Sequence, residues 1–290
     1  MHMSQATVIG LGEMGAALAG ALVRGGRSVT VWNRTGAKAE RLVREGAVLA
    51  PSAAEAVRAS PVVVVCVSDY TATRDVLETE EVAAALAGRA LIQLSTGTPK
   101  EARDAEAWAL RHGAEYLDGA ILAWPSQIGG TEAVLLASGA RATYQRNEAL
   151  LKTVAGGVTY MGEAIGLSSA LFAAVLSYLA GRWIGLCHGA RICEVEGLSV
   201  ASFGATLARL APVLGEDARH MGDVIEKGAY ADPESTLSTA GADIGRLVQH
   251  AEEAGINAEV PRFAAALFRR AIDAGYGAEE HAALIKVLRT

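Results

Sequence analysis

Cysteine is scarce in this chain of 290 residues, which contains only Cys66, Cys187 and Cys193. Each lies in an apolar segment, and none has the spacing to other ligand-type side chains that a metal site requires. We therefore expect three reduced thiols in the core of a cytoplasmic protein, and we expect no metal site.

Positive charge is also in short supply. The chain has 26 Lys and Arg against 32 Asp and Glu, which gives a net charge of −6, and no basic run stands out. Proteins that bind nucleic acid cluster basic side chains against the phosphates, so no nucleic-acid partner is expected.

Uninterrupted apolar runs of membrane-spanning length are missing as well. The most apolar stretch, residues 166–186, is broken by Ser168, Ser169, Ser177, Tyr178 and Arg182. This composition predicts a buried helix rather than a membrane span. We expect no secretory leader either, since the N-terminus runs directly into a strand pattern.

The first half of the chain alternates between strand and helix patterns. Short β-branched runs occur at residues 7–9, 28–32, 62–67, 90–94, 115–117, 133–136 and 158–161. Most are separated by Ala-, Leu- and Glu-rich segments with helical spacing, which is typical of an α/β fold with a doubly wound parallel sheet. After residue 162 we find no strand pattern. A long helix is expected over residues 166–196 and several shorter helices after it.

A glycine motif stands at the end of the first strand. Gly10, Gly12 and Gly15 form G-x-G-x-x-G between a strand and a helix, which is the arrangement that receives a dinucleotide pyrophosphate at a helix N-terminus. Residues 1–162 are therefore expected to form a Rossmann-type cofactor domain. Residues 163–290 are expected to supply a long interdomain helix and an all-α substrate and dimerisation domain.

The end of the second strand indicates which dinucleotide binds. An acidic residue there would bond the ribose of NAD, but this chain has Asn33, Arg34 and Thr35, with Lys38 one turn later. These side chains would attract a 2′-phosphate, so we expect NADP(H). The predicted cofactor-binding residues are Gly10, Leu11, Gly12, Glu13, Met14, Gly15, Asn33, Arg34, Thr35, Lys38, Val67, Ser68 and Thr96.

Several segments resemble the imine reductases and reductive aminases of the β-hydroxyacid dehydrogenase superfamily, over nearly the whole chain. GLGEMG and VWNRTGAKAE are shared widely in the superfamily, and the narrower segments are CVSDY, LSTGTPKEA, YLDGAILAWPSQIG, ESTL, EEAGINAEVPR and GYGAEEHAALIKVLR. The resemblance implies an NADPH-dependent reduction of a cyclic imine or iminium by an intertwined homodimer. It also implies a structural, backbone-bonding role for Asp118.

Two features depart from these families. The catalytic lysine of the hydroxyacid enzymes is missing from the long helix. Aligned on Gly185 and His188, the polar positions of the imine reductases fall on Phe172 and Ala180. Without a proton donor at these two positions, preformed iminium ions become the favoured substrates. A shifted register would instead bring in Ser169, Ser177 or Tyr178.

The remaining site predictions come from the segments that resemble the family and from this helix. Thr96 and Tyr178 are the candidate catalytic residues, and the predicted substrate pocket comprises Leu122, Trp124, Phe172, Leu176, Ala180, Ala240 and Gly241. Two alternatives stay open. One is a carbonyl reductase of the 2-hydroxyacid or semialdehyde type, and the other is an NADP-binding protein that has lost catalysis.

Overall fold

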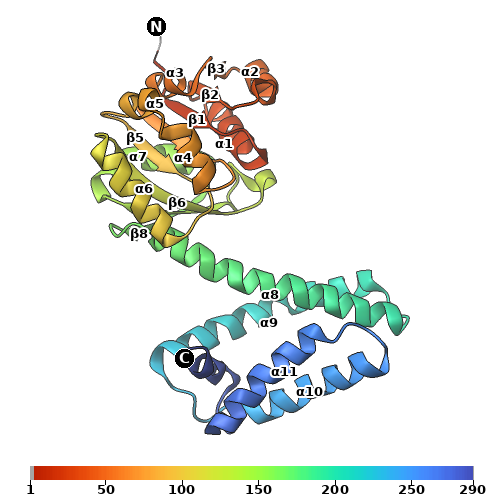
Figure 1. The fold of residues 1–290 in the computed structure, drawn as a ribbon. Coiled ribbons are helices and arrows are strands. Elements are labelled where there is room, and N and C mark those ends of the chain that lie inside the picture. Colours follow the sequence, from red (N-terminus) through yellow and green to blue (C-terminus); the bar gives the residue numbers. More distant parts are fainter. Residues whose placement is uncertain (1–2, 290) are drawn as a thin grey trace. The chain divides into compact units, whose positions relative to one another are not determined.

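The computed structural model describes residues 3–289, which divide into two compact units, the first ending at Ser177 and the second beginning at Tyr178 (Figure 1). The predicted boundary after residue 162 follows the last strand, whereas this division lies inside helix α8 (Leu167–Val195). The difference arises because the first turn of α8 is tied to the first unit. Ser168 bonds Ser138, and Ser169 bonds Asp118.

The first unit is built on one eight-stranded sheet with the order β3-β2-β1-β4-β5-β6-β7-β8. Its strands are β1 (Ala6–Ile9), β2 (Val29–Trp32), β3 (Val48–Leu49), β4 (Val62–Val65), β5 (Ala90–Gln93), β6 (Glu115–Leu122), β7 (Val134–Gly139) and β8 (Gly157–Gly162). All seven predicted strands are present. The sequence missed β3, because it is a two-residue edge strand whose side chains are both exposed and carry no alternation.

One strand pair departs from the predicted parallel sheet. β6 and β7 pair antiparallel, with Leu122 opposite Val134, while every other pair is parallel. Parallel neighbours need a long crossover, usually a helix, between them. The connection from β6 to β7 holds only the short turn η2 (Pro125–Gln127), so the chain returns along the neighbouring strand in the opposite direction.

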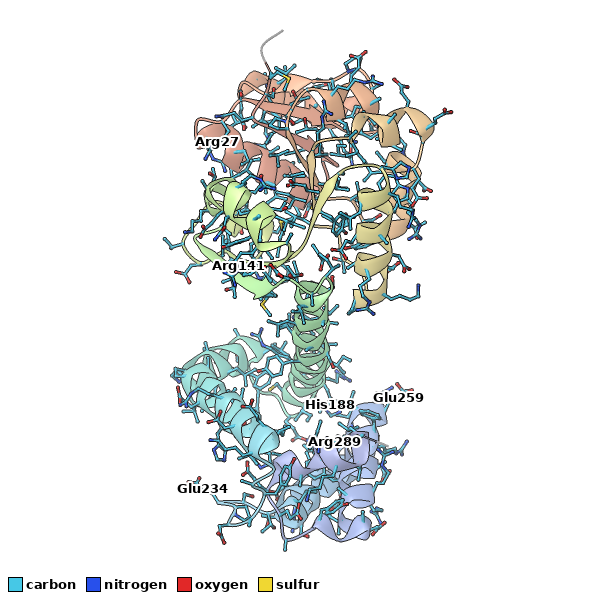
Figure 2. The ribbon with its side chains drawn as sticks, turned by 90° about the vertical axis from the view of Figure 1, so that its left-hand side faces the viewer. Arg27, Arg141, His188, Glu234, Glu259 and Arg289 are labelled. Carbon is cyan, nitrogen blue, oxygen red and sulfur yellow. The ribbon has the colours of Figure 1, made fainter. Side chains whose placement is uncertain are left out.

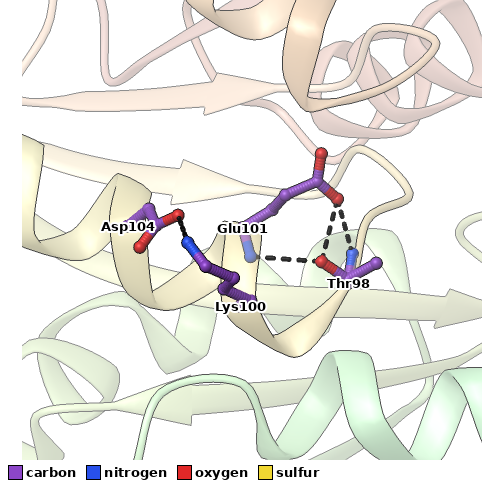
Figure 3. A network of polar contacts seen from close by, with 4 residues as sticks. All are labelled: Thr98, Lys100, Glu101 and Asp104. Atoms are coloured by element: carbon purple, nitrogen blue, oxygen red, sulfur yellow. Dashed lines mark hydrogen bonds and ion pairs between the residues drawn. The ribbon is translucent and has the colours of Figure 1, made fainter.

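Helices cover both faces of this sheet (Figure 1). They are α1 (Glu13–Arg24), η1 (Gly36–Ala39), α2 (Glu40–Arg44), α3 (Ala53–Arg58), α4 (Tyr70–Leu77), α5 (Glu80–Ala85), α6 (Pro99–Arg111) and α7 (Arg141–Val154). Local sequence sets where α6 begins. Thr98 Oγ1 accepts from the backbone N–H of Glu101, and the Glu101 carboxylate accepts from the backbone N–H of Thr98 (Figure 3). This reciprocal pair is a capping box, with proline at the first helical position.

The second unit is helical, as predicted. Beyond the later part of α8 it contains α9 (Val200–Lys227), α10 (Leu237–Glu253), α11 (Glu259–Ala271), η3 (Ile272–Tyr276), η4 (His281–Leu284) and α12 (Ile285–Leu288). Its core gathers Val224, Leu237 and Ala271 with neighbouring side chains. The Nε2 atom of His188, a residue labelled in Figure 2, lies 3.2 Å from the carbonyl oxygen of Asn257, so this side chain is engaged within the second unit.

Helix α8 is more exposed than the sequence predicts. It is the one helix within residues 3–289 that is long and apolar enough to cross a membrane, and none of its most apolar stretch is buried. The prediction of a buried helix is therefore wrong for the single chain. The exposed apolar side chains include Leu171, Leu176, Trp183 and Ile184.

Candidate functional site

The turn between β1 and α1 has the geometry of a phosphate cradle. Gly10 has a φ of +94°, and a Cβ there would lie 2.3 Å from the carbonyl oxygen of Cys66. A Cβ at Gly15 would lie 2.1 Å from the carbonyl oxygen of Gly10, whereas one at Gly12 would meet nothing within 4 Å. No side chain caps α1. Its first N–H groups therefore face open space, where a pyrophosphate fits.

A cavity of about 450 Å³ extends from this cradle along the carboxyl ends of β1, β2 and β4. In a doubly wound sheet, this is the crevice where the strand order reverses. Its wall includes eleven predicted cofactor residues: Gly10, Gly12, Glu13, Met14, Gly15, Asn33, Arg34, Thr35, Lys38, Val67 and Ser68. The sequence did not predict the other lining residues, although Trp32 ends β2 and Cys66 directly follows β4; these residues are Trp32, Cys66, Ala72, Asp75 and Val76.

The basic end of this cavity carries two free cations. Arg34 and Lys38 are both exposed, and neither side chain has a hydrogen bond or ion pair within the described chain. Asn33 is already engaged, since its Oδ1 accepts from the Leu11 N–H at 3.0 Å and its Nδ2 donates to the Thr35 carbonyl at 3.0 Å. Asn33 and Leu11 therefore fix the loop, while the two cations are available to an anion.

A second cavity of about 430 Å³ adjoins the first and shares Glu13, Met14, Cys66 and Val67 with it. Of the predicted residues, Thr96, Trp124 and Phe172 line it. The sequence missed Ser95 and Gly119 here, and it offered Ser169 only as an alternative. Among the lining residues only Glu13 and Cys66 titrate, and burial raises the pKa of the Cys66 thiol to about 12. Cys66 is therefore a neutral thiol at physiological pH.

A buried carboxyl stands directly behind this cavity. Asp118 is 0% exposed, its Oδ1 accepts from the Tyr70 hydroxyl at 2.7 Å, and its Oδ2 accepts from Ser169 Oγ at 2.8 Å. The Ser169 N–H also donates to Asp118 Oδ2 at 3.3 Å, so the predicted bond to the backbone is one of three hydrogen bonds that this carboxyl accepts. Burial outweighs these hydrogen bonds and raises the pKa of Asp118 above its ordinary value.

Comparison with known proteins identifies this arrangement. Residues 5–162 match the NAD-binding domain of 6-phosphogluconate dehydrogenase, and residues 164–290 match the C-terminal domain of NADPH-dependent reductive aminase-like proteins. The NADPH-dependent reductive aminase of Aspergillus oryzae is 31% identical over 97% of this chain and 96% of its own length. The chain belongs to the imine reductase and reductive aminase family. The resemblance inferred from its motifs is thereby confirmed.

Solved structures of family members support the same assignment. The imine reductase from Myxococcus stipitatus in complex with NADP⁺ has a TM-score of 0.94 and 35% identity, covering 98% of this chain and 99% of that one. The reductive aminase from Aspergillus terreus, in complex with NADPH and ethyl levulinate, has a TM-score of 0.92 and 32% identity, with 99% of both chains covered. This imine reductase-family chain is therefore an oxidoreductase with the predicted Rossmann-type fold.

The structure does not bring all the predicted site residues of this family member into one cavity. Leu122 ends β6 and is half-buried, and Leu176 is exposed on α8; neither lines the cavity that holds Phe172. Tyr178 is 61% exposed and lines a groove of the second unit together with Phe203 of α9. Its catalytic role stays a prediction.

The other predicted substrate residues also lie in the second unit. Ala180 is half-buried on α8, and Ala240 is half-buried on α10. A Cβ at Gly241 would lie 3.0 Å from Cδ1 of Ile272 and 3.5 Å from Phe268, so this glycine lets α10 pack closely on its neighbours. Their placement in a substrate pocket stays a prediction.

Proposed function

We propose that this enzyme uses NADPH to reduce a cyclic imine or iminium ion to an amine. The observation that carries the proposal is the cavity beside the cradle. Phe172 lines it at the position where imine reductases usually have a polar residue, and only Glu13 and Cys66 titrate among its lining side chains. A wall of this kind suits a substrate whose carbon is already electrophilic.

The choice of NADPH is supported by the cradle and by its basic end. The glycine turn leaves no side chain in the way of a pyrophosphate, and the Arg34 and Lys38 side chains are free to neutralise a 2′-phosphate. The bound cofactor supplies a hydride from nicotinamide C4. The chain's own residues orient the substrate carbon, and Thr96 offers a hydroxyl at the cavity wall.

A preformed iminium needs only that hydride, because its nitrogen becomes a neutral amine once the carbon is reduced. The ring of Phe172 offers such a cation a π face, and a desolvated cation–π contact contributes on the order of 1–2 kcal/mol. Ala180, the second position at which the family's proton donor is expected, carries no donor either. Iminium ions are therefore the favoured substrates.

We also propose that the enzyme is a homodimer in which a second chain covers α8. The exposed side chains Leu171, Trp183 and Ile184 are too apolar to remain in water along a helix of this length. Arg182 in the middle of the helix argues against a membrane as the covering phase. Sedimentation at micromolar concentration should give a dimer, and a fully active monomer would refute this part. The cytoplasmic location stays a prediction.

The activity can be tested by following NADPH oxidation with matched substrates. A cyclic imine and its N-methyl iminium salt should both be reduced, and the iminium rate should be nearly independent of pH across neutrality. Faster turnover of 2-oxo acids or semialdehydes would favour the carbonyl reductase instead. Tight NADPH binding with no turnover of any of them would favour a protein that has lost catalysis.

A further inference from the structure

The proposed function leaves one chemical requirement open for neutral imines. Reduction of a neutral C=N bond needs a proton at nitrogen as well as a hydride at carbon, and Phe172 stands where a donor would be expected. Ser169 is one helical turn before Phe172 on α8, and it lines the same cavity. Its side chain is therefore placed to reach the space beside Phe172.

We propose that Ser169 and Asp118 deliver this proton, and that Tyr70 then returns a proton to Asp118 from a cavity on the far side of this carboxyl. The inference rests on the proposed function, since it names the proton source for that reaction. Ser169 Oγ lies 2.8 Å from Asp118 Oδ2, and the Tyr70 hydroxyl lies 2.7 Å from Asp118 Oδ1. One buried carboxyl thus joins the cavity wall to a buried phenol.

Tyr70 connects this pair to a third cavity. That space measures about 260 Å³, and both Tyr70 and Tyr116 line it. The two phenol oxygens lie 3.4 Å apart. Its wall also carries Glu101 and Asp104 of α6, which are drawn in Figure 3, and Arg111 at the end of the same helix. Exposed charged groups keep this side in contact with water, from which protons can enter.

The groups around Asp118 are suited to pass a proton between this carboxyl, Ser169 and Tyr70. α4 and α8 contribute Tyr70 and Ser169, and the neighbouring strands place the uncharged Gln93 and Ser138 opposite Asp118. Within residues 3–289, no cation bonds or pairs with this carboxyl. Burial raises its pKa, and burial likewise raises the pKa values of Tyr70 and Tyr116, so both phenols stay protonated at rest.

One acidic side chain outside this group acts on Tyr116. Glu106 of α6 acts on Tyr116 through its charge, and burial raises the pKa of Glu106 too. Negative charge near the network disfavours ionisation of its members. Burial therefore favours the protonated carboxyl of Asp118 over the bare carboxylate, while the hydrogen bonds donated by Tyr70 and Ser169 limit the shift.

With the cofactor bound, the substrate carbon would receive its hydride, and the C=N π electron pair would move to nitrogen. That nitrogen takes the proton of Ser169 Oγ, while Oγ accepts the proton of the Asp118 carboxyl. The products are the amine, the oxidised cofactor and an Asp118 carboxylate. Tyr70 then passes its proton to Asp118 and takes another from water in the third cavity.

The first test compares two adjacent serines. Ser169→Ala removes the delivering hydroxyl, whereas Ser168→Ala removes an equally buried hydroxyl that bonds Ser138 at 2.9 Å and lines neither cavity. Ser169→Ala should slow the neutral cyclic imine about 100-fold, since a placed general acid contributes roughly 10²–10⁴-fold. Its rate with the N-methyl iminium should stay close to the parent rate. Ser168→Ala should leave both rates unchanged.

The outcomes distinguish proton delivery by Ser169 and Asp118 from the proposed function. If Ser169→Ala lowers the rates with both substrates equally, or lowers neither rate, the proton-delivery role is overturned while imine reduction stands. A parent enzyme that reduces neither substrate would overturn the proposed function and the delivery role with it. Asp118→Asn should repeat the pattern of Ser169→Ala. If that variant does not fold, the serine pair alone decides the outcome.

A second readout needs no turnover. Infrared difference spectra of the cofactor-free protein against Asp118→Asn report the protonation of this one carboxyl as the pH is varied. The titration midpoint should lie above the ordinary range of aspartate, and Tyr70→Phe should raise it further, because the phenol donates to the carboxylate. The neutral-imine rate of the parent should fall as pH rises through that midpoint. A midpoint in or below the ordinary range would overturn the inference.

Discussion

Replacing Arg34 by alanine tests the cofactor site without disturbing the fold. Arg34 is exposed, lines the cofactor cavity, and has no hydrogen bond or ion pair within the described residues. The substitution therefore removes no intramolecular contact, and the free energy of unfolding of the cofactor-free protein should not change. Any effect on binding reports the interaction with the bound nucleotide.

The expected magnitude follows from simple electrostatics. A phosphate monoester carries about −1.5 to −2 charges at neutral pH. Each unit pair at about 4 Å gains roughly 1 kcal/mol in water, so the guanidinium contributes about 2 kcal/mol before any hydrogen bond is counted. With the range of about 1.5–3 kcal/mol for charge-assisted bonds, NADPH should bind about 10–150-fold more weakly to Arg34→Ala. NADH, which lacks the 2′-phosphate, should bind almost as before.

Fluorescence titration with both cofactors measures this difference, and Arg44→Ala is a matched control. Arg44 is an exposed arginine at the end of α2 and does not line the cavity. Its replacement should leave both affinities unchanged. The NADPH preference should shrink towards 1 M salt, where the Debye length falls to about 3 Å. Equal weakening of both cofactors by Arg34→Ala, or a parent that prefers NADH, would refute the assignment.

Gly10→Ala should lower the free energy of unfolding, measured by chemical denaturation, by about 1–3 kcal/mol or more, because Gly10 has a positive φ and its Cβ would meet the Cys66 carbonyl. Gly12→Ala should fold normally and bind NADPH less tightly, and equal free energies of unfolding for the two variants would count against the cradle. Ala180→Asp should raise the rate with a neutral imine more than with its N-methyl iminium, and an equal change would show that this position does not face the substrate nitrogen. Alkylation at neutral pH, read out by mass spectrometry, should spare the buried Cys66; Cys187 is exposed in the single chain, which makes its expected core position wrong there, but it lies on the helix that we propose a second chain covers. The pKa of Cys66 near 12 also means that the stability gained from its neutral thiol is lost as pH rises from about 9 to about 12, which denaturation at several pH values checks.

Much of the first unit was predictable because its signals are local. The buried β-branched runs, the glycines of the first turn and the absence of an acid after β2 depend only on neighbouring residues, and the structure brings most of the predicted cofactor residues into one cavity. The sequence did not indicate the antiparallel β7, because the predicted strand ended at residue 117, whereas β6 runs to Leu122 and leaves only a short connection before β7. It also could not show that Asn33 is engaged by Leu11 rather than free.

The sequence by itself determined the family, the fold class and the cofactor cradle, since these follow from residue types at fixed spacing along short segments. Only the tertiary structure decided the surroundings of Asp118. Tyr70, Asp118 and Ser169 are far apart in the chain and meet because β6 is central in the sheet, with α4 and the first turn of α8 packed on it. A carboxyl's protonation depends on burial and on partners from several elements, and neither property is encoded in the residues beside it.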